Sequence, residues 1–113
     1  MVTLYGIPNC DTVKKARTWL AARGIDYVFH DYKKSGVAPE KLAAWIASAG
    51  RDTVLNRAGT TFRKLPEADK ADLDADRAIA LMVANPSCIK RPIVEHPGGL
   101  LVGFREPEWD AAL

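Results

Sequence analysis

Cys10 is the residue with the clearest potential for chemistry in this sequence. It lies where a short apolar run, Val2 to Tyr5, gives way to a segment with helical spacing. The start of a helix presents unpaired backbone N–H groups and a partial positive charge, and both favour a thiolate over a thiol. Lys14, four residues further on, lies on the same helical face and adds positive charge. We therefore expect the pKa of Cys10 to lie below the value of about 8.5 for a free cysteine, and Cys10 to act as a nucleophile.

A basic segment near the end of the chain is the second candidate. Lys90 and Arg91 stand directly before Pro92, which opens an apolar run. The planar guanidinium of Arg91 can hold an oxyanion or a carboxylate through two parallel hydrogen bonds. A solvated basic loop is the alternative interpretation.

Two further arginines and the second cysteine have open roles. Arg57 lies in a loop-like segment whose backbone N–H groups could form an anion-binding nest, and Arg105 follows the last apolar run. For both, an ordinary surface cation is the alternative. Cys88 is either a resolving thiol for Cys10 or, as is more common for an isolated cysteine, a small packing residue.

The spacing of cysteine and histidine argues against two other kinds of chemistry. These residues lie at positions 10, 30, 88 and 96, without the close ligand pairs of a zinc finger, so we expect no metal. Val13 stands three residues after Cys10, where a CxxC motif would have its second thiol. Exchange between two thiols of one motif is therefore excluded.

The elements that position Cys10 follow from the hydrophobic pattern. Strand-like runs at 2–5 and 27–32 enclose a helical pattern that opens at Cys10 and ends near Gly24. Strand, helix and strand in so short a segment predict a βαβ unit with parallel strands and a right-handed crossover.

The middle of the chain predicts mostly helix. Apolar residues at helical spacing indicate helices at 39–50 and 74–84, and the second can be capped by Asp74. The segment from 51 to 70 is rich in loop and cap residues, so we expect it to be irregular. The inward-facing residues of the second helix are expected to be Ile79, Met82 and Val83.

The C-terminal part predicts a hairpin and a final helix. Runs at 93–95 and 100–104 are joined by a Pro-Gly-Gly turn, and a short helix begins at Pro107. A βαβ unit followed by ββα is the order of a thioredoxin-like α/β fold, in one domain covering 1–113 with a helical insertion at about 37–85. In such folds the proline before the third strand is usually cis and faces the active-site cysteine, so we expect a cis bond before Pro92.

Composition narrows the functional class. The 113 residues carry a net charge of +2, with basic residues scattered among acidic ones, which argues against nucleic acid as a partner. No apolar run reaches the roughly 18 residues of a membrane span, and no basic, apolar leader opens the chain. We expect a cytoplasmic monomer without a bound cofactor.

Three motifs resemble the arsenate reductase (ArsC) family, in its YffB-like branch. They are Tyr5-Gly6-Ile7-Pro8-Asn9-Cys10-Asp11-Thr12-Val13-Lys14-Lys15-Ala16, the segment from Leu55 to Leu65, and the segment from Asn85 to Ile93. The resemblance covers nearly the whole chain in the same order. It implies a thioredoxin-like core with a helical insertion, and a catalytic role for Cys10. The residues that would bind the substrate are Thr12, Lys14, Arg57, Arg91, Pro92 and Arg105.

The same resemblance leaves three functions open. The first is a glutathione-dependent thiol or oxyanion reductase, with a small oxidised thiol as substrate and glutathione, with or without a glutaredoxin, as reductant. The second is arsenate reduction. Asn56 in place of an arginine, and Val13-Lys14 in place of Ser-Arg, argue against an arsenate pocket. The third is a redox-sensing regulator that binds RNA polymerase, as the related Spx proteins do, although most of those carry CxxC.

Overall fold

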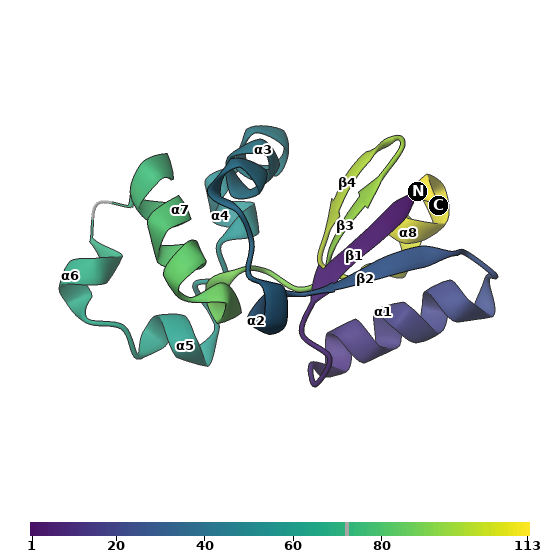
Figure 1. Ribbon diagram of the computed structural model, residues 1–113, viewed down its shortest axis with the longest axis horizontal. Coiled ribbons are helices and arrows are strands. Elements are labelled where there is room, and N and C mark those ends of the chain that lie inside the picture. The colour runs from purple at the N-terminus through teal and green to yellow at the C-terminus, as the bar shows by residue number, and fades with distance from the viewer. Residues whose placement is uncertain (72) are drawn as a thin grey trace. The chain divides into compact units, whose positions relative to one another are not determined.

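The chain divides after Ser35 and before Arg91 into two units. The computed structural model describes residues 1–71 and 73–113. Met1–Ser35 and Arg91–Leu113 form the first unit, and Gly36–Lys90 form the second (Figure 1). The inserted segment thus runs from 36 to 90, where the sequence predicted about 37 to 85. That the whole chain behaves as one domain stays a prediction.

The first unit is built on a mixed sheet. Its four strands in the described residues are β1 (Val2–Gly6), β2 (Tyr27–Asp31), β3 (Ile93–His96) and β4 (Gly99–Val102), in the order β2-β1-β3-β4 (Figure 1). β1 pairs in parallel with β2 and antiparallel with β3, and β3 pairs antiparallel with β4. The predicted βαβ unit and hairpin are therefore confirmed, and so is the thioredoxin-like α/β fold.

The second strand is shorter than the sequence predicted. It ends at Asp31, and Tyr32 begins a short helix, α2 (Tyr32–Ser35). The Asp31 carboxylate accepts hydrogen bonds from the backbone N–H groups of Lys33 and Lys34, at 2.9 and 3.3 Å. This side-chain cap satisfies the first N–H groups of the helix and turns the chain away from the sheet.

Two helices of the first unit share one buried cluster with the sheet. They are α1 (Asp11–Ala22) and α8 (Glu106–Ala112). In the sheet register, Leu4 lies opposite Phe29 and Val94, so these side chains point to the same face. The cluster consists of Val2, Leu4, Val13, Ala16, Trp19, Leu20, Val94, Leu101 and Trp109.

Gly6 allows the first turn of α1 to lie close to β1. A Cβ atom on Gly6 would stand 2.8 Å from Cγ2 of Val13, and Val13 is fully buried. Real Cβ atoms do not approach other carbons so closely, so any larger residue at this position would push Val13 outward. Because Val13 lies three residues after Cys10, Gly6 helps to set the position of the cysteine.

The second unit is helical. Two longer helices, α3 (Pro39–Ala49) and α7 (Ala75–Ala84), contact each other. Four short helices accompany them: α4 (Arg51–Val54), α5 (Thr60–Arg63), α6 (Glu67–Lys70) and η1 (Pro86–Cys88). The prediction of irregular structure at 51–70 was therefore wrong in part. One-turn helices leave no apolar periodicity for a sequence pattern to reveal.

The inner face of α7 differs from the sequence prediction at one position. Ala78 and Met82, four residues apart, are fully buried, and Ile79 is half-buried. Val83, expected to face inward, is 41% exposed. Val83 follows Met82 by about 100° around the helix axis, which turns it away from the buried stripe.

Replacing Asp74 with alanine should lower the free energy of unfolding by about 0.5–2 kcal/mol. The Asp74 carboxylate caps α7 by accepting a hydrogen bond from the backbone N–H of Arg77 at 2.8 Å. Alanine leaves that N–H without its partner. Urea unfolding followed by circular dichroism measures the change. Asp74→Asn keeps the acceptor oxygen and should retain most of the stability. Equal losses of unfolding free energy in Asp74→Ala and Asp74→Asn would mean that the negative charge of Asp74, and not its hydrogen bond, stabilises α7.

Candidate active site

Cys10 lies at the N-cap position of α1. Its backbone is extended, with φ −84° and ψ 127°, and its C=O accepts the first helical hydrogen bond, from the N–H of Lys14 at 2.9 Å. Its own N–H donates to the carbonyl of Ile7 at 3.1 Å, which closes a tight turn between β1 and the helix. The side chain is half-buried, so the sulfur is held by the fold and still reachable from solvent.

The surroundings of the sulfur lower the pKa of Cys10 below its ordinary value. Partial burial, the largest single influence, raises it. The backbone N–H groups of Val13 and Thr12 lower it, and the charge and hydrogen bond of Arg91 lower it further. These N–H groups belong to the second and third residues of the helix, which an N-cap side chain faces, although the sulfur forms no capping hydrogen bond of standard geometry. Together these lowering influences outweigh the effect of burial, so the surroundings favour the thiolate form of Cys10.

Arg91 reaches Cys10 because of the antiparallel pairing of β1 and β3. Tyr5 lies opposite Ile93, so the residues before β3 emerge at the edge of the sheet where β1 ends and the Cys10 loop begins. The Arg91–Pro92 peptide bond is cis, as predicted. The structure thus brings together two residues that are 81 positions apart, and their catalytic and binding roles stay predictions.

Sequence reasoning missed the interactions among Tyr5, Tyr32 and Glu95 near this edge of the sheet. Tyr32 is fully buried; burial raises its pKa well above the ordinary value, although the charge of Arg91 opposes the rise. The Tyr5 ring stacks on Tyr32 with centroids 6.4 Å apart, and the Tyr5 hydroxyl donates to Oε1 of Glu95 at 2.7 Å. The positive charge of Arg91 therefore lowers the pKa of the neutral Tyr32 phenol as well as that of Cys10.

The other candidate residues of the first unit are placed differently. Thr12 is exposed, and its backbone N–H lowers the pKa of Cys10. Lys14 is exposed on α1. Arg105 stands at the N-cap of α8 with its side chain 75% exposed, and its Nη1 lies 3.6 Å from Oε1 of Glu108. The charge that acts on the Cys10 sulfur is that of Arg91.

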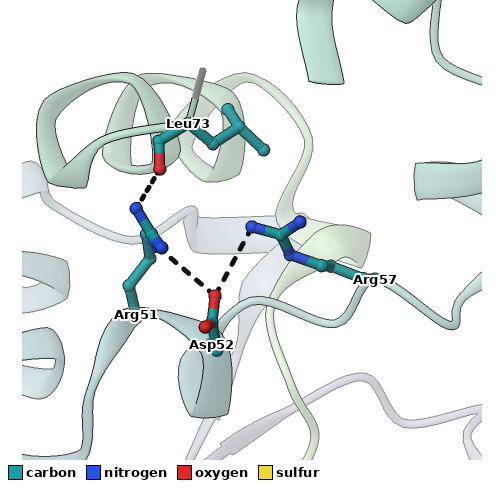
Figure 2. Close-up of polar contacts among 4 residues, drawn as sticks. All are labelled: Arg51, Asp52, Arg57 and Leu73. Carbon is teal, nitrogen blue, oxygen red and sulfur yellow. Dashed lines mark hydrogen bonds and ion pairs between the residues drawn. The ribbon is translucent and has the colours of Figure 1, made fainter. Parts of the chain in front are cut away.

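Arg57 belongs to the second unit, where it takes part in a small polar cluster. Figure 2 shows Arg51 and Arg57 converging on the same carboxylate oxygen of Asp52, at 3.3 and 3.4 Å. Arg51 also donates to the carbonyl of Leu73. The single negative charge of Asp52 is thus shared between Arg51 and Arg57, and the part of Arg57 in binding a substrate stays a prediction.

Cys88 is a buried residue of the second unit. Its side chain is 1% exposed, and its carbonyl accepts a hydrogen bond from the N–H of Asn56 at 2.7 Å. Its backbone N–H donates to the carbonyl of Asn85 at 2.8 Å. These contacts tie η1 to the segment after α4, as expected of a packing residue.

A thioredoxin-like fold with one half-buried cysteine at the start of its first helix defines the structural class. The family model of ArsC matches residues 5–112, so the chain belongs to the ArsC family. No helix in the described parts of the chain is both long enough and apolar enough to cross a membrane.

The similar proteins carry different names. A solved structure named YffB protein has a TM-score of 0.97 and 58% identity, covering 100% of this chain and 99% of the other. A structure of an arsenate reductase (ArsC) related protein from Brucella melitensis has a TM-score of 0.76 and 53% identity, with coverage of 98% and 92%. The global transcriptional regulator Spx of Streptococcus pyogenes is 30% identical, over 100% of this chain and 85% of its own.

Proposed function

We propose that the protein is a thiol-dependent reductase in which Cys10 attacks an oxidised sulfur substrate and glutathione supplies the electrons. The observation that carries the proposal is the half-buried cysteine whose pKa is lowered by helix N–H groups and by Arg91. A thiolate is the nucleophilic form of cysteine, and a group that both reacts and remains accessible is suited to exchange. Membership of the ArsC family supports the same class of chemistry.

The reaction proceeds by two exchanges at Cys10. The Cys10 thiolate attacks one sulfur of a disulfide, a new S–S bond forms, and the other sulfur leaves as a thiolate that takes a proton from water. A glutathione thiolate then attacks the sulfur of the retained group, releases the Cys10 thiolate and forms a mixed disulfide with that group. A second glutathione thiolate attacks the glutathione sulfur of this product, so the retained group leaves as a thiol and glutathione disulfide forms. With a glutaredoxin, that protein's thiolate removes the retained group instead. Each round moves two electrons from thiols to the substrate disulfide.

Arg91 has two roles in this scheme. Before the reaction it stabilises the Cys10 thiolate, and during attack it remains close to the negative charge spread over the reacting sulfurs. Its guanidinium fork also suits an oxyanion, which keeps arsenate as an alternative substrate. Turnover of arsenate with glutathione and glutaredoxin, lost in Cys10→Ser, would favour that alternative over exchange with disulfides.

Incubation with oxidised glutathione, followed by mass spectrometry of peptides, tests the proposal. We expect one glutathione on Cys10 and none on Cys88, because Cys88 is 1% exposed. Addition of reduced glutathione should remove the adduct and restore the thiol. An unmodified Cys10 under conditions that modify a free cysteine peptide would overturn the proposal.

A regulatory function is the second candidate, because Spx proteins match the whole chain. A disulfide switch within the cysteine loop is excluded here, since Val13 occupies the place of a second thiol and is fully buried. A pull-down with the α subunit of RNA polymerase distinguishes the two candidates. Retention of the protein at physiological salt would favour the regulatory function.

A further inference from the structure

The buried phenol of Tyr32 has no part in the scheme above. Tyr32 opens α2 directly after β2, and the Asp31 carboxylate caps that helix, so a local hydrogen bond fixes where Tyr32 begins its turn. The side chain is fully buried. Within the described residues every buried side-chain nitrogen and oxygen has a hydrogen-bond partner, so the Tyr32 hydroxyl is held at a definite position.

The sheet register brings Tyr32 and Arg91 to the same edge of the sheet. β1 lies between β2 and β3, and Tyr5 of β1 is paired with His30 on one side and with Ile93 on the other (Figure 1). Tyr32 follows His30 by two residues. Arg91 precedes Ile93 by two residues on the antiparallel strand. Both residues therefore stand just beyond the end of β1, on its two sides.

The guanidinium of Arg91 lies close to two different groups at this edge. A hydrogen bond from its side chain and its positive charge both lower the pKa of Cys10. The same charge opposes the rise in pKa that burial causes in Tyr32. A guanidinium carries several N–H donors in one rigid plane, so one side of it can face the sulfur while another faces an oxygen.

Tyr32 is held from the sheet, independently of Arg91. Its ring stacks on that of Tyr5 with centroids 6.4 Å apart and planes inclined by 22°. The Tyr5 hydroxyl donates to Oε1 of Glu95 at 2.7 Å, and the Tyr5 ring lies 4.9 Å from the ring of His30. These contacts join β1, β2, β3 and α2, which all belong to the first unit. The phenol is therefore a fixed point against which a mobile side chain can be oriented.

We propose that Tyr32 is a positioning residue, whose hydroxyl oxygen accepts a hydrogen bond from Arg91 and holds the guanidinium against the Cys10 sulfur. The proposal rests on the proposed function, because it names what orients the charge beside the same reacting thiolate. An arginine side chain has many rotamers, and a fixed acceptor reduces the number that Arg91 samples. Burial keeps the phenol neutral, so it orients Arg91 without cancelling the positive charge, as a carboxylate in its place would.

Tyr32→Phe tests this role, because it removes the hydroxyl and keeps the ring that stacks on Tyr5. Alkylation of the full-length protein by iodoacetamide, followed on the Cys10 peptide by mass spectrometry, gives the rate as a function of pH. We expect the midpoint to rise by about half a pH unit, which slows the reaction about threefold on the acidic side of the profile. A residue that only fills space would leave the midpoint where it is.

Tyr27→Phe is the matched control. The Tyr27 hydroxyl accepts a hydrogen bond from Nε of Arg17 at 3.0 Å in the same unit. Its removal therefore deprives a different arginine of a phenol oxygen and should leave the Cys10 midpoint unchanged. Circular dichroism and urea unfolding verify that each variant is folded over the pH range used.

A double-mutant cycle shows whether the hydroxyl acts through Arg91. In the Arg91→Ala protein, Tyr32→Phe should cause no further rise of the midpoint, because the side chain to be oriented is gone. The other titratable or charged side chains close in sequence to Cys10, or in the cluster around Tyr32, are the same in all four proteins of the cycle. They are Tyr5, Asp11, Lys14, Lys15, His30, Asp31, Lys33, Lys34 and Glu95.

A second variant keeps the test decisive if Tyr32→Phe is too unstable to measure. Tyr5→Phe removes the hydrogen bond to Glu95 and keeps the stacked ring, so it loosens the support of Tyr32. We expect a smaller rise of the midpoint in the same direction. An unchanged midpoint in this variant, when Tyr32→Phe cannot be measured, would overturn the positioning role.

The remaining outcomes separate this role from the proposed function. An unshifted or lower midpoint in Tyr32→Phe would overturn the positioning role and leave disulfide exchange at Cys10 intact. An equal rise with and without Arg91, or an equal rise in Tyr27→Phe, would assign the effect to the general surroundings of the thiol and would also overturn it. Failure of wild-type Cys10 to accept glutathione would instead refute the proposed function, whatever the midpoints are.

Discussion

Replacing Cys10 with serine should reduce glutathione-dependent disulfide reduction to below about a thousandth of the wild-type rate. A serine hydroxyl stays protonated at neutral pH and forms no disulfide. Both exchanges therefore lose the sulfur atom at which the S–S bond forms and breaks. The substitution changes one half-buried atom at the start of α1 and should leave the fold intact. A coupled assay of glutathione oxidation measures the rate, and circular dichroism with urea unfolding verifies the fold.

Cys88→Ala is the matched control for this experiment. Because Cys88 is 1% exposed, alanine should retain the turnover and lose only some packing stability. A variant that still accepts glutathione on Cys10 but turns over slowly would make Cys88 the resolving thiol. Full activity in Cys10→Ser would contradict the nucleophilic role of Cys10, whatever the control shows.

The parts of the fold that sequence reasoning predicted correctly depend on local signals. The βαβ unit follows from two apolar runs around a helical pattern, and the hairpin follows from its Pro-Gly-Gly turn. The position of Cys10 at the N-cap is likewise local, because it depends on where a strand ends and a helix begins. Arg91 required a further step, since only the topology of a thioredoxin-like fold brings it to the Cys10 loop.

The parts that sequence reasoning missed depend on contacts between distant segments. Tyr5 and Glu95 are 90 positions apart, and their hydrogen bond depends on the register between β1 and β3. Tyr32 is buried at the end of β2, where the sequence showed one more strand residue. The sequence feature that could have revealed this was Asp31, whose side chain caps α2 and ends the strand one residue earlier. The burial of aromatic residues beside Arg91 could therefore not be read from periodicity.

Arg91→Ala should raise the pKa of Cys10 and slow its alkylation at neutral pH by about tenfold. Arg91 lowers the pKa of Cys10 through its charge and a hydrogen bond, so its removal makes the thiolate less stable. The N–H groups of Thr12 and Val13 remain, and the pKa should therefore rise only part of the way. The rate of alkylation by iodoacetamide as a function of pH gives the midpoint directly.

The pH dependence separates loss of ionisation from loss of structure. Well above both midpoints the thiol is ionised in either protein, so the two rates should converge, whereas a disordered site would differ at every pH. Arg91→Lys keeps the charge but loses the planar fork, and should fall between the two proteins. Arg23→Ala removes an exposed arginine that pairs with Asp110 in the same unit, and should leave the midpoint unchanged. An unshifted midpoint in Arg91→Ala would mean that the helix N–H groups alone hold the thiolate, and that Arg91 acts on the substrate or not at all.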